Sequence, residues 1–231
     1  LSSKEEQELE GILSRLRDFE PIQYVQGGVN FMGHRFRVAP GVLIPRPETE
    51  ELVEIMLKEI PAEARILDVG TGSGCIAVSL SKGLPDARVV AWDVSEEALA
   101  IARGNNEALQ ASVRFALCNV LTCRPSREDR YDVIVSNPPY VLEKERKEME
   151  RNVLDWEPSL ALFVPDTDPL RFYRRIAELG REMLVAGGRL YFEINRAFGE
   201  ATVAMLCEQG YANARILKDI SGNDRFVLAE R

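Results

Sequence analysis

The sequence predicts an α/β fold with a seven-stranded, mostly parallel sheet that ends in a C-terminal antiparallel hairpin. From Arg65 onward, short apolar segments alternate with amphipathic segments of helical period, which is typical of a parallel sheet covered on both faces. The last two apolar segments are separated only by residues 219–223, and a connection that short joins antiparallel strands. With 231 residues, of which 45% are hydrophobic, the chain can bury one substantial core.

The chain starts with one amphipathic helix. From about Glu5 to Phe19, apolar residues recur at helical spacing on one face, and Glu20-Pro21 ends that pattern. We interpret residues 1–20 as the last helix of a larger unit.

A small β-hairpin and a second helix lead into the sheet. Residues Val29 to Val38 alternate loosely around Gly33, which indicates a hairpin, and Pro45-Arg46-Pro47 precedes an amphipathic helical segment. We therefore assign residues 21–46 to a linker and β-hairpin and residues 47–231 to the main domain.

The main domain contains seven apolar segments of strand length, five of them in strand–helix–strand order and two in the terminal hairpin. They are Arg65 to Val69, Arg88 to Trp92, Val113 to Leu117, Tyr131 to Ser136, Arg189 to Ile194, Asn213 to Leu217 and Arg225 to Ala229. One strand of the hairpin must run antiparallel to the rest.

The composition disfavours several function classes. The formal net charge is -8 and the sequence pI is about 5.0, so the surface repels a phosphate backbone and we expect no direct nucleic-acid binding. His34 is the single histidine, which disfavours a catalytic triad centred on histidine and a metal site with several histidines. We therefore expect no metal. The four cysteines fit neither a zinc ribbon nor a CxxC pair, so we interpret them as reduced thiols.

The sequence also gives no sign of a membrane segment. No apolar stretch approaches the length needed to cross a bilayer, and residues Leu1 to Glu6 are too polar for a signal peptide. We expect a cytoplasmic protein.

A glycine-rich loop follows the first strand of the sheet. Gly70-Thr71-Gly72-Ser73-Gly74 ends that strand and opens a helix. Glycine permits positive φ and a close approach of ligand to backbone, and the free N–H groups of the helix start favour an anionic group. The loop is therefore a candidate cofactor site; the alternative is a tight strand-to-helix turn without a ligand.

An acidic residue follows the second strand at the spacing that ribose binding requires. Asp93 stands nineteen positions after Gly74, where a carboxylate can hydrogen-bond both ribose hydroxyls. Its alternative role is a helix N-cap, although Ser95 can fill that position. A glycine-rich loop followed by a ribose-binding acidic residue is also typical of NAD-binding proteins. These two motifs alone therefore do not identify the cofactor.

The fourth strand runs directly into Asn137-Pro138-Pro139-Tyr140, at the carboxyl edge of the sheet. Proline has no N–H, so this backbone can only accept hydrogen bonds, and its conformation is restricted. The side-chain oxygen of Asn137 and the carbonyl of Pro138 can together hold the two hydrogens of a planar NH2 group. The alternative is an ordinary Asn-Pro turn.

Two hydrogen-bond acceptors that hold an NH2 group in this way would activate a weak nucleophile. An amide nitrogen has a delocalised lone pair, and acceptors on its hydrogens can return electron density to it and aim it at a methyl donor. Tyr140 would stack on the planar group or form a wall of the pocket. No general base is needed if the proton leaves after methyl transfer.

These motifs resemble those of the release factor glutamine methyltransferases, the HemK/PrmC family, which belong to the Rossmann-like class I S-adenosylmethionine-dependent methyltransferases. The resemblance runs from Pro21 to the C-terminus and is most specific at residues 45–50. The further segments that carry it are Pro21 to Gly27, Leu43 to Glu50, Trp156-Glu157-Pro158 and Asp219 to Arg225.

The resemblance implies an activity. The substrate would be the side-chain amide of the glutamine in the Gly-Gly-Gln motif of class 1 peptide chain release factors. S-adenosyl-L-methionine would be the cofactor and S-adenosyl-L-homocysteine the product, and we expect a monomer.

The resemblance also implies roles for individual residues. The tetrapeptide Asn137 to Tyr140 would be catalytic and bind the substrate glutamine, with Arg46 near the pocket unless it is an ordinary surface arginine. The cofactor would contact Gly70, Thr71, Gly72, Ser73, Gly74, Asp93, Asn119, Val120 and Asn137. Asn119 and Val120 are assigned by position alone, next to the adenine, and a turn asparagine is the alternative for Asn119.

The chain departs from the family pattern in several places. Members carry an N-terminal helical domain, of which residues 1–20 would be the final helix, the rest being truncated or absent. Asn195 stands where a glycine is expected, Phe198 where a glutamine is, Trp156 where a tyrosine is and Asn119 where an acid is.

Two other functions fit parts of the pattern. An amino-group methyltransferase acting on adenine or guanine in nucleic acid would face the same hydrogen-bonding problem. A non-catalytic nucleotide-binding module would keep the fold without needing the tetrapeptide.

Overall fold

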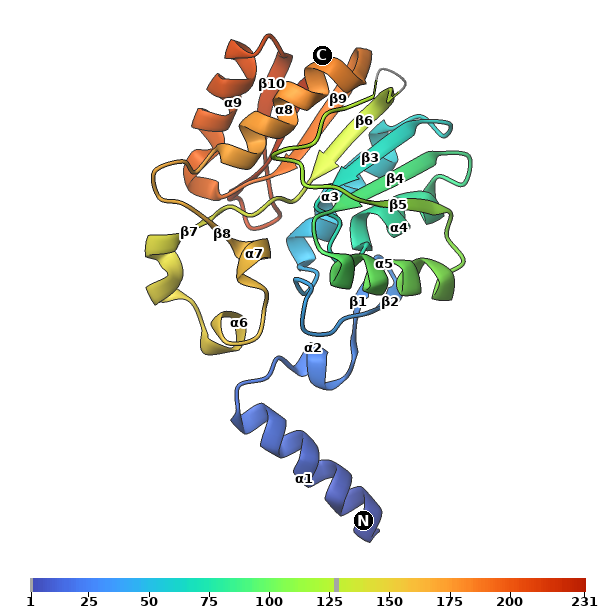
Figure 1. Cartoon of the computed structure of the whole chain (residues 1–231), viewed down its shortest axis with the longest axis vertical. Coiled ribbons are helices and arrows are strands. Elements are labelled where there is room, and N and C mark those ends of the chain that lie inside the picture. The colour runs from blue at the N-terminus through green and yellow to red at the C-terminus, as the bar shows by residue number, and fades with distance from the viewer. Residues whose placement is uncertain (1, 127–128) are drawn as a thin grey trace.

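A computed structural model describes residues 2–126 and 129–231 of the chain. The chain forms a rounded body with one helix projecting from it like a stalk (Figure 1). Leu1, the first residue of the polar segment discussed above, lies outside the described residues.

The body is built on a seven-stranded sheet in the order β10-β11-β9-β6-β3-β4-β5. β11 is antiparallel to both of its neighbours, whereas the pairs from β9 to β5 are parallel. The strands are β3 (Arg65–Val69), β4 (Arg88–Asp93), β5 (Val113–Leu117), β6 (Tyr131–Ser136), β9 (Leu184–Glu193), β10 (Ala212–Lys218) and β11 (Asp224–Glu230). The predicted mostly parallel sheet and its terminal antiparallel hairpin are confirmed.

Helices cover both faces of this sheet (Figure 1). Ile66 points into a core shared with α3 and α4, whereas the next residue, Leu67, points into a core shared with α8 and α9. This alternation follows from the two-residue period of a strand, and it explains why buried strands are apolar on both sides. The helices are α3 (Pro47–Glu59), α4 (Cys75–Gly83), α5 (Glu96–Ala108), α8 (Arg171–Met183) and α9 (Gly199–Glu208).

The predicted small hairpin consists of β1 (Gly28–Phe31) and β2 (His34–Arg37). Met32 and Gly33 both have positive φ, as a two-residue turn that matches the strand twist requires. The rings of Phe31 and Phe36 meet edge to face at 5.8 Å and are buried in the core shared with α3. A short helix, α2 (Ile22–Val25), precedes the hairpin.

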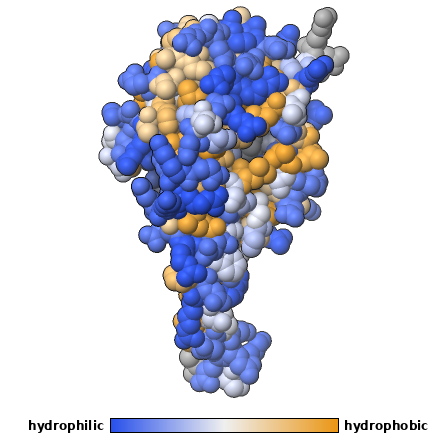
Figure 2. All heavy atoms as spheres, turned by 60° about the vertical axis from the view of Figure 1, so that its left-hand side comes forward, coloured by the Kyte–Doolittle hydropathy of each residue, from blue (hydrophilic) through white to orange (hydrophobic). Residues whose placement is uncertain are grey.

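The stalk is α1 (Ser3–Arg17), which ends two residues before the predicted Phe19. A capping box between Ser2 and Glu5 closes its start, and none of its residues is buried. Figure 2 shows mostly hydrophilic residues on the side of the stalk turned toward the viewer. The Nε1 of Trp156 donates to the carbonyl of Asp18 at 3.1 Å and so ties the end of the stalk to the body.

The expected start of β9 at Arg189 is wrong, because the strand begins at Leu184. Gly187 has a φ of 74°, and the register with β6 shifts between Tyr131 and Val133. The glycine pair at 187–188 is therefore a bulge inside the strand and does not form a turn before it.

A segment between β6 and α8, for which the sequence predicted no element, folds beside the carboxyl edge of the sheet (Figure 1). It contains β7 (Val141–Leu142), a 3₁₀ helix (Glu143–Glu148), α6 (Arg151–Leu154), α7 (Ser159–Leu162) and β8 (Phe163–Val164), and a second 3₁₀ helix (Arg196–Phe198) follows β9. None of the described helices combines the length and the apolar character needed to cross a bilayer.

Candidate active site

Three strands bring the predicted site residues to one level of the carboxyl edge. Val69 at the end of β3 is in register with Trp92 on β4 and with Ser136 on β6. The residues that follow them are Gly70, Asp93 and Asn137, so the glycine loop, the acid and the tetrapeptide start side by side. Parallel pairing alone produces this convergence, and ligands of α/β sheets bind at this edge.

The glycine loop is folded back onto the end of β4. Its residues Gly70 and Thr71 donate their backbone N–H groups to the carbonyl of Trp92, at 2.8 and 3.0 Å. All three glycines have positive φ: 78° at Gly70, 55° at Gly72 and 82° at Gly74. A Cβ atom added at Gly70 or Gly72 would meet nothing within 4 Å, whereas one at Gly74 would lie 3.1 Å from the Cβ of Ala102. The first two glycines therefore face open space, and the third is needed for helix packing.

Asp68, which the sequence analysis did not single out, braces this loop from beneath. It is fully buried at the end of β3, and it accepts a hydrogen bond from the hydroxyl of Thr71 at 2.6 Å. Burial raises the pKa of Asp68 to about 7, the charge of Asp93 adds to the rise, and the Thr71 hydrogen bond opposes it. An acidic residue just before the first loop glycine was the sequence signal that could have identified it.

Asp93 is positioned by the backbone on two sides. Its Oδ2 accepts from the N–H of Gly72 at 2.8 Å and its Oδ1 from the N–H of Ser95 at 2.9 Å. Ser95 is the N-cap of α5, accepting from Ala98 at 3.2 Å, so the alternative that Asp93 caps this helix is wrong. Each carboxylate oxygen keeps a second lone pair with which to accept a hydroxyl.

Asn119 and Val120 lie after β5, at the outer end of the same edge. The side-chain oxygen of Asn119 accepts from the N–H of Leu121 at 3.0 Å, which is the turn geometry named as the alternative. Val120 is half-buried and packs against the core shared with α8 and α9. Contact of either residue with an adenine stays a prediction.

The tetrapeptide presents two acceptors without partners. The Nδ2 of Asn137 donates to the hydroxyl of Thr49 at 3.3 Å. Neither the Oδ1 of Asn137 nor the carbonyl of Pro138 accepts a hydrogen bond from residues 2–126 or 129–231. The hydroxyl of Tyr140 donates to Glu193 at 3.2 Å, and burial raises its pKa well above the usual range. This is the acceptor arrangement expected for holding an NH2 group.

A pocket of about 180 Å³ opens beside these acceptors. Arg46 lies in it and pairs with Glu157, whose other oxygen accepts from the N–H of Ile44 at 3.0 Å. Glu157 is itself buried, so it fixes both the arginine and the chain that leads to it. The residues lining the pocket are Leu43, Arg46, Asn137, Pro138, Tyr140, Val141, Met149, Val153, Ala161 and Leu162.

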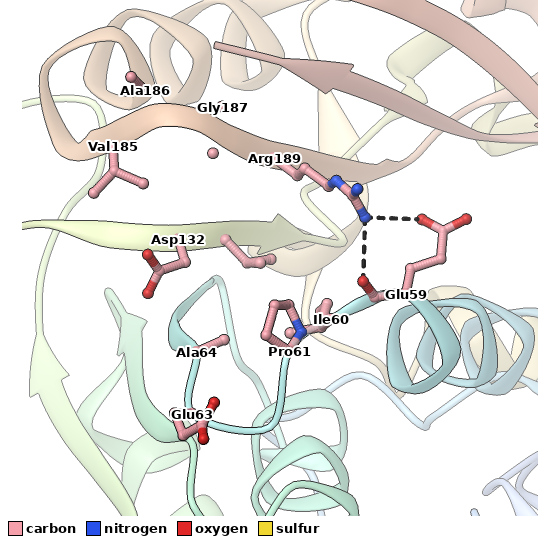
Figure 3. Close-up of a pocket in the computed structure, with 12 residues that line it drawn as sticks. Glu59, Ile60, Pro61, Glu63, Ala64, Asp132, Val185, Ala186, Gly187 and Arg189 are labelled. Atoms are coloured by element: carbon pink, nitrogen blue, oxygen red, sulfur yellow. Dashed lines mark hydrogen bonds and ion pairs between the residues drawn. The ribbon is translucent and has the colours of Figure 1, made fainter.

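A larger pocket, of about 410 Å³, lies at the opposite, amino edge of the sheet (Figure 3). Arg189 contacts Glu59 at 3.7 Å and also donates to the carbonyl of that residue at 3.2 Å. Asp132 accepts from the backbone N–H of Arg65 at 2.7 Å and forms an ion pair with its side chain. Size alone would select this pocket, but three of its four charged side chains are in ion pairs and the fourth, Glu63, is exposed.

The carboxyl edge fits the cofactor that the resemblance implies. Open space over Gly70 and Gly72 admits a ligand to the backbone, and the carboxylate of Asp93 supplies negative charge for a cationic donor. Within the described residues, no three histidine, cysteine, aspartate or glutamate side chains gather as a metal site.

Known proteins resemble the chain in sequence and in fold. Residues 46–155 match the family described as methyltransferase small domain. The release factor glutamine methyltransferase of Bacteroides thetaiotaomicron is 61% identical over 231 residues, which cover 100% of this chain and 83% of that protein. That of Flavobacterium psychrophilum is 48% identical over 223 residues, covering 94% and 78%.

A solved structure shares the fold. The T. thermophilus 16S rRNA N2 G1207 methyltransferase, in complex with AdoMet and guanosine, superposes with a TM-score of 0.63 over 88% of this chain and 49% of that one. At 18% identity, this likeness bears on the fold alone.

Proposed function

The chain belongs to the release factor glutamine methyltransferases, and from that membership we propose that its carboxyl edge methylates the glutamine of a Gly-Gly-Gln motif in a class 1 peptide chain release factor. The methyl donor is S-adenosyl-L-methionine, and the acceptor is the side-chain amide nitrogen of the glutamine. The pair of free acceptors on Asn137 and Pro138 carries this proposal.

The chain would bind the cofactor through the backbone of the glycine loop and through acidic side chains. Gly70 to Gly74 would approach it through the backbone, with Thr71 and Ser73 inside the same loop. Asp93 would accept from the ribose hydroxyls, and Asn119 and Val120 would flank the adenine. When bound, the cofactor supplies a methyl group on a positively charged sulfur, which the carboxylates of this edge favour.

Around the substrate, the chain supplies acceptors. The Oδ1 of Asn137 and the carbonyl of Pro138 would each take one hydrogen of the glutamine NH2 group. That grip draws electron density to a nitrogen whose lone pair is otherwise delocalised into the carbonyl. Holding the nitrogen in line with the donor makes the reaction effectively intramolecular. The effective concentration of one reacting group at the other is then roughly 10⁵ M or more.

The remaining residues shape the pocket. Pro138 and Pro139 stiffen the loop so that the two acceptors keep their spacing. Tyr140, with its hydroxyl tied to Glu193, would offer its ring as the wall beside the planar amide. Arg46, held by Glu157, would line the entrance and meet the release factor backbone or side chains.

The charge of the chain supports a protein substrate. A formal net charge of -8 opposes binding to nucleic acid. We therefore propose that the protein acts on the release factor without binding nucleic acid directly, and we propose that it does so as a monomer.

Methyl transfer from labelled S-adenosylmethionine tests the proposal. The chain is incubated with a class 1 release factor, with the same factor carrying alanine for the motif glutamine, and with ribosomal RNA. We expect label only on the first, and mass spectrometry to place one methyl group on the glutamine. Label on RNA, or equal label on the alanine variant, would refute the substrate.

A further inference from the structure

Two consecutive side-chain hydrogen bonds, from Asn137 to Thr49 and from Thr49 to Glu193, hold the side chain of Asn137 in place. Its Nδ2 donates to the hydroxyl of Thr49 at 3.3 Å, and that hydroxyl donates to the Oε2 of Glu193 at 2.7 Å. Thr49 lies in the first turn of α3 and is 2% exposed, and Glu193 ends β9 and is 1% exposed. These partners are 88 and 144 residues apart in the sequence, so only the fold assembles them.

The direction of this chain follows from its chemistry. An ionised carboxylate only accepts hydrogen bonds, and a threonine hydroxyl has a single hydrogen to give. Because Thr49 donates that hydrogen to Glu193, its oxygen can only accept from Asn137. The amide of Asn137 must therefore turn its NH2 group toward Thr49 and its Oδ1 away from it.

This direction rests on geometry: the hydroxyl of Thr49 donates to the Oε2 of Glu193 and the hydroxyl of Tyr140 to its Oε1. Burial raises the pKa of the Glu193 carboxyl, and these two hydroxyls and the nearby Arg225 reduce that rise without cancelling it. The neighbouring Glu48 adds to the rise. Both carboxylate oxygens thus have a hydroxyl donor, which suits an acceptor-only group.

The orientation of the Asn137 amide matters because its two ends have nearly the same shape. A flipped amide would fit the site equally well but would present hydrogens to the hydrogens of the substrate NH2 group. Only the hydrogen-bond network behind Asn137 distinguishes the two orientations. We propose that Thr49 and Glu193 are positioning residues that fix the Oδ1 of Asn137 toward the substrate amide, an inference that rests on the proposed function.

The same carboxylate ties the other end of the tetrapeptide. Its Oε1 accepts from the hydroxyl of Tyr140, and Asn195, two residues after Glu193, donates its Nδ2 to the carbonyl of Tyr140 at 3.2 Å. The end of β9 therefore fixes the polarity of Asn137 and the position of the tyrosine ring together.

Removal of the Thr49 hydroxyl tests the proposal. Thr49→Val keeps the size but cannot accept from Asn137, and we expect kcat for release factor methylation to fall about tenfold or more, because a freed amide populates both orientations. Thr49→Ser keeps the hydroxyl, and we expect it to retain kcat within about threefold of wild type. Cofactor affinity should stay within about threefold in both, since the hydroxyl does not face the glycine loop.

Thr202→Val is a matched control. Thr202 is also fully buried, and its hydroxyl donates to the carbonyl of Phe198 at 2.8 Å, but it has no contact with the tetrapeptide. We expect a loss of stability with unchanged kcat. If Thr49→Val does not fold, Thr49→Ala removes the same hydroxyl with less bulk and replaces it in the comparison.

A readout without substrate separates this inference from the proposed function. The side-chain NH2 of Asn137 is identified in the nitrogen–proton spectrum by its loss in Asn137→Ala, and we expect slow solvent exchange in wild type and fast exchange in Thr49→Val. Wild-type protein that methylates no release factor would overturn the proposed function, whatever the spectrum shows. Wild-type kcat in Thr49→Val, equal losses in the serine and valine variants, or unchanged exchange would overturn the positioning role.

Discussion

The two edges of the central sheet each carry a pocket, and the pockets differ in which hydrogen-bonding groups lack a partner. At the amino edge, in the larger cavity of about 410 Å³, Arg189 pairs with Glu59 and Asp132 pairs with Arg65. At the carboxyl edge, beside a cavity of about 180 Å³, the acceptors of Asn137 and Pro138 have no partner within the described ranges. The two acceptors lie beside the glycine loop and Asp93 at the carboxyl ends of the strands, and for that reason we place the substrate there and not in the larger cavity.

The largest expected effect is on turnover. Asn137→Ala should lower kcat by roughly 100-fold or more, because it removes an acceptor worth about 1–3 kcal/mol and the alignment that the acceptor provides. Affinity for S-adenosylmethionine, measured by calorimetry, should change only a few-fold.

The amino edge supplies the control for turnover. Arg189→Gln breaks the contact with Glu59 and should leave kcat within about twofold of wild type, since Arg189 lies at the other edge. A wild-type rate in Asn137→Ala would discredit the assigned role.

The next effect is on the cofactor. Asp93→Ala removes the proposed ribose acceptor and the anchor of the Gly72 N–H, so the dissociation constant for S-adenosylmethionine should rise about tenfold or more. Asp132→Ala at the amino edge should leave it unchanged. Equal affinities in the two variants would show that the ribose is held by other groups.

Two glycines with the same backbone conformation lie at opposite edges of the sheet. Gly72 and Gly187 both have positive φ, and a Cβ atom added to either meets nothing within 4 Å. Gly72→Ala and Gly187→Ala should each cost about 1–2 kcal/mol of stability from backbone strain. Only Gly72→Ala should also weaken cofactor binding, and an equal loss in both variants would remove Gly72 from the site.

The last prediction concerns the pH dependence of stability. Burial raises the pKa of Asp68 to about 7, above its unfolded value of 3.8. The folded state therefore holds this proton more tightly, so the stabilisation is complete below about pH 4 and is lost as the pH rises through about 7. Burial would also raise the pKa of Asp132, but the N–H and guanidinium of Arg65 outweigh it and lower the pKa.

The contributions of Asp68 and Asp132 to stability therefore change with pH in opposite directions. Asp132 contributes stability above its unfolded pKa of 3.8, and this contribution is lost as the pH falls through its lower folded value. Melting temperatures can be measured between about pH 3 and pH 8. Toward neutral pH they should decline less in Asp68→Asn than in wild type, and toward acid pH they should decline less in Asp132→Asn than in wild type. Parallel curves for wild type and both variants would contradict these assignments.

The sequence was sufficient for the sheet because its information is local. β3, β5 and β6 have the predicted bounds. For β3 and β6 the reason is an apolar run followed directly by Gly70 or Asn137, which marks the end of a buried strand. The short elements between β6 and α8 were missed because two-residue strands and four-residue helices carry no periodicity. The bulge in β9 was missed because a Gly-Gly pair is more typical of a turn.

The site divides in the same way. The glycine loop, Asp93 and the tetrapeptide could be located because each directly follows a strand. Thr49 lies in the segment 45–50 that carries the family resemblance, but its contact with Glu193 could not be predicted, because a hydrogen bond between residues 144 apart has no local pattern.

Two departures from the family pattern have a structural use that no motif would reveal. Asn195 donates to the carbonyl of Tyr140, and Trp156 donates to the carbonyl of Asp18. Both contacts support backbone near the pocket or the stalk, so they depend on the tertiary fold.

A crystal structure of the chain with S-adenosylhomocysteine and a peptide containing Gly-Gly-Gln would show which atoms hold the substrate glutamine. We expect the glutamine side-chain nitrogen in the pocket at the carboxyl edge, about 3 Å from both the Oδ1 of Asn137 and the carbonyl of Pro138. A glutamine bound at the amino edge, or an Asn137 amide turned away from it, would refute the proposed substrate site.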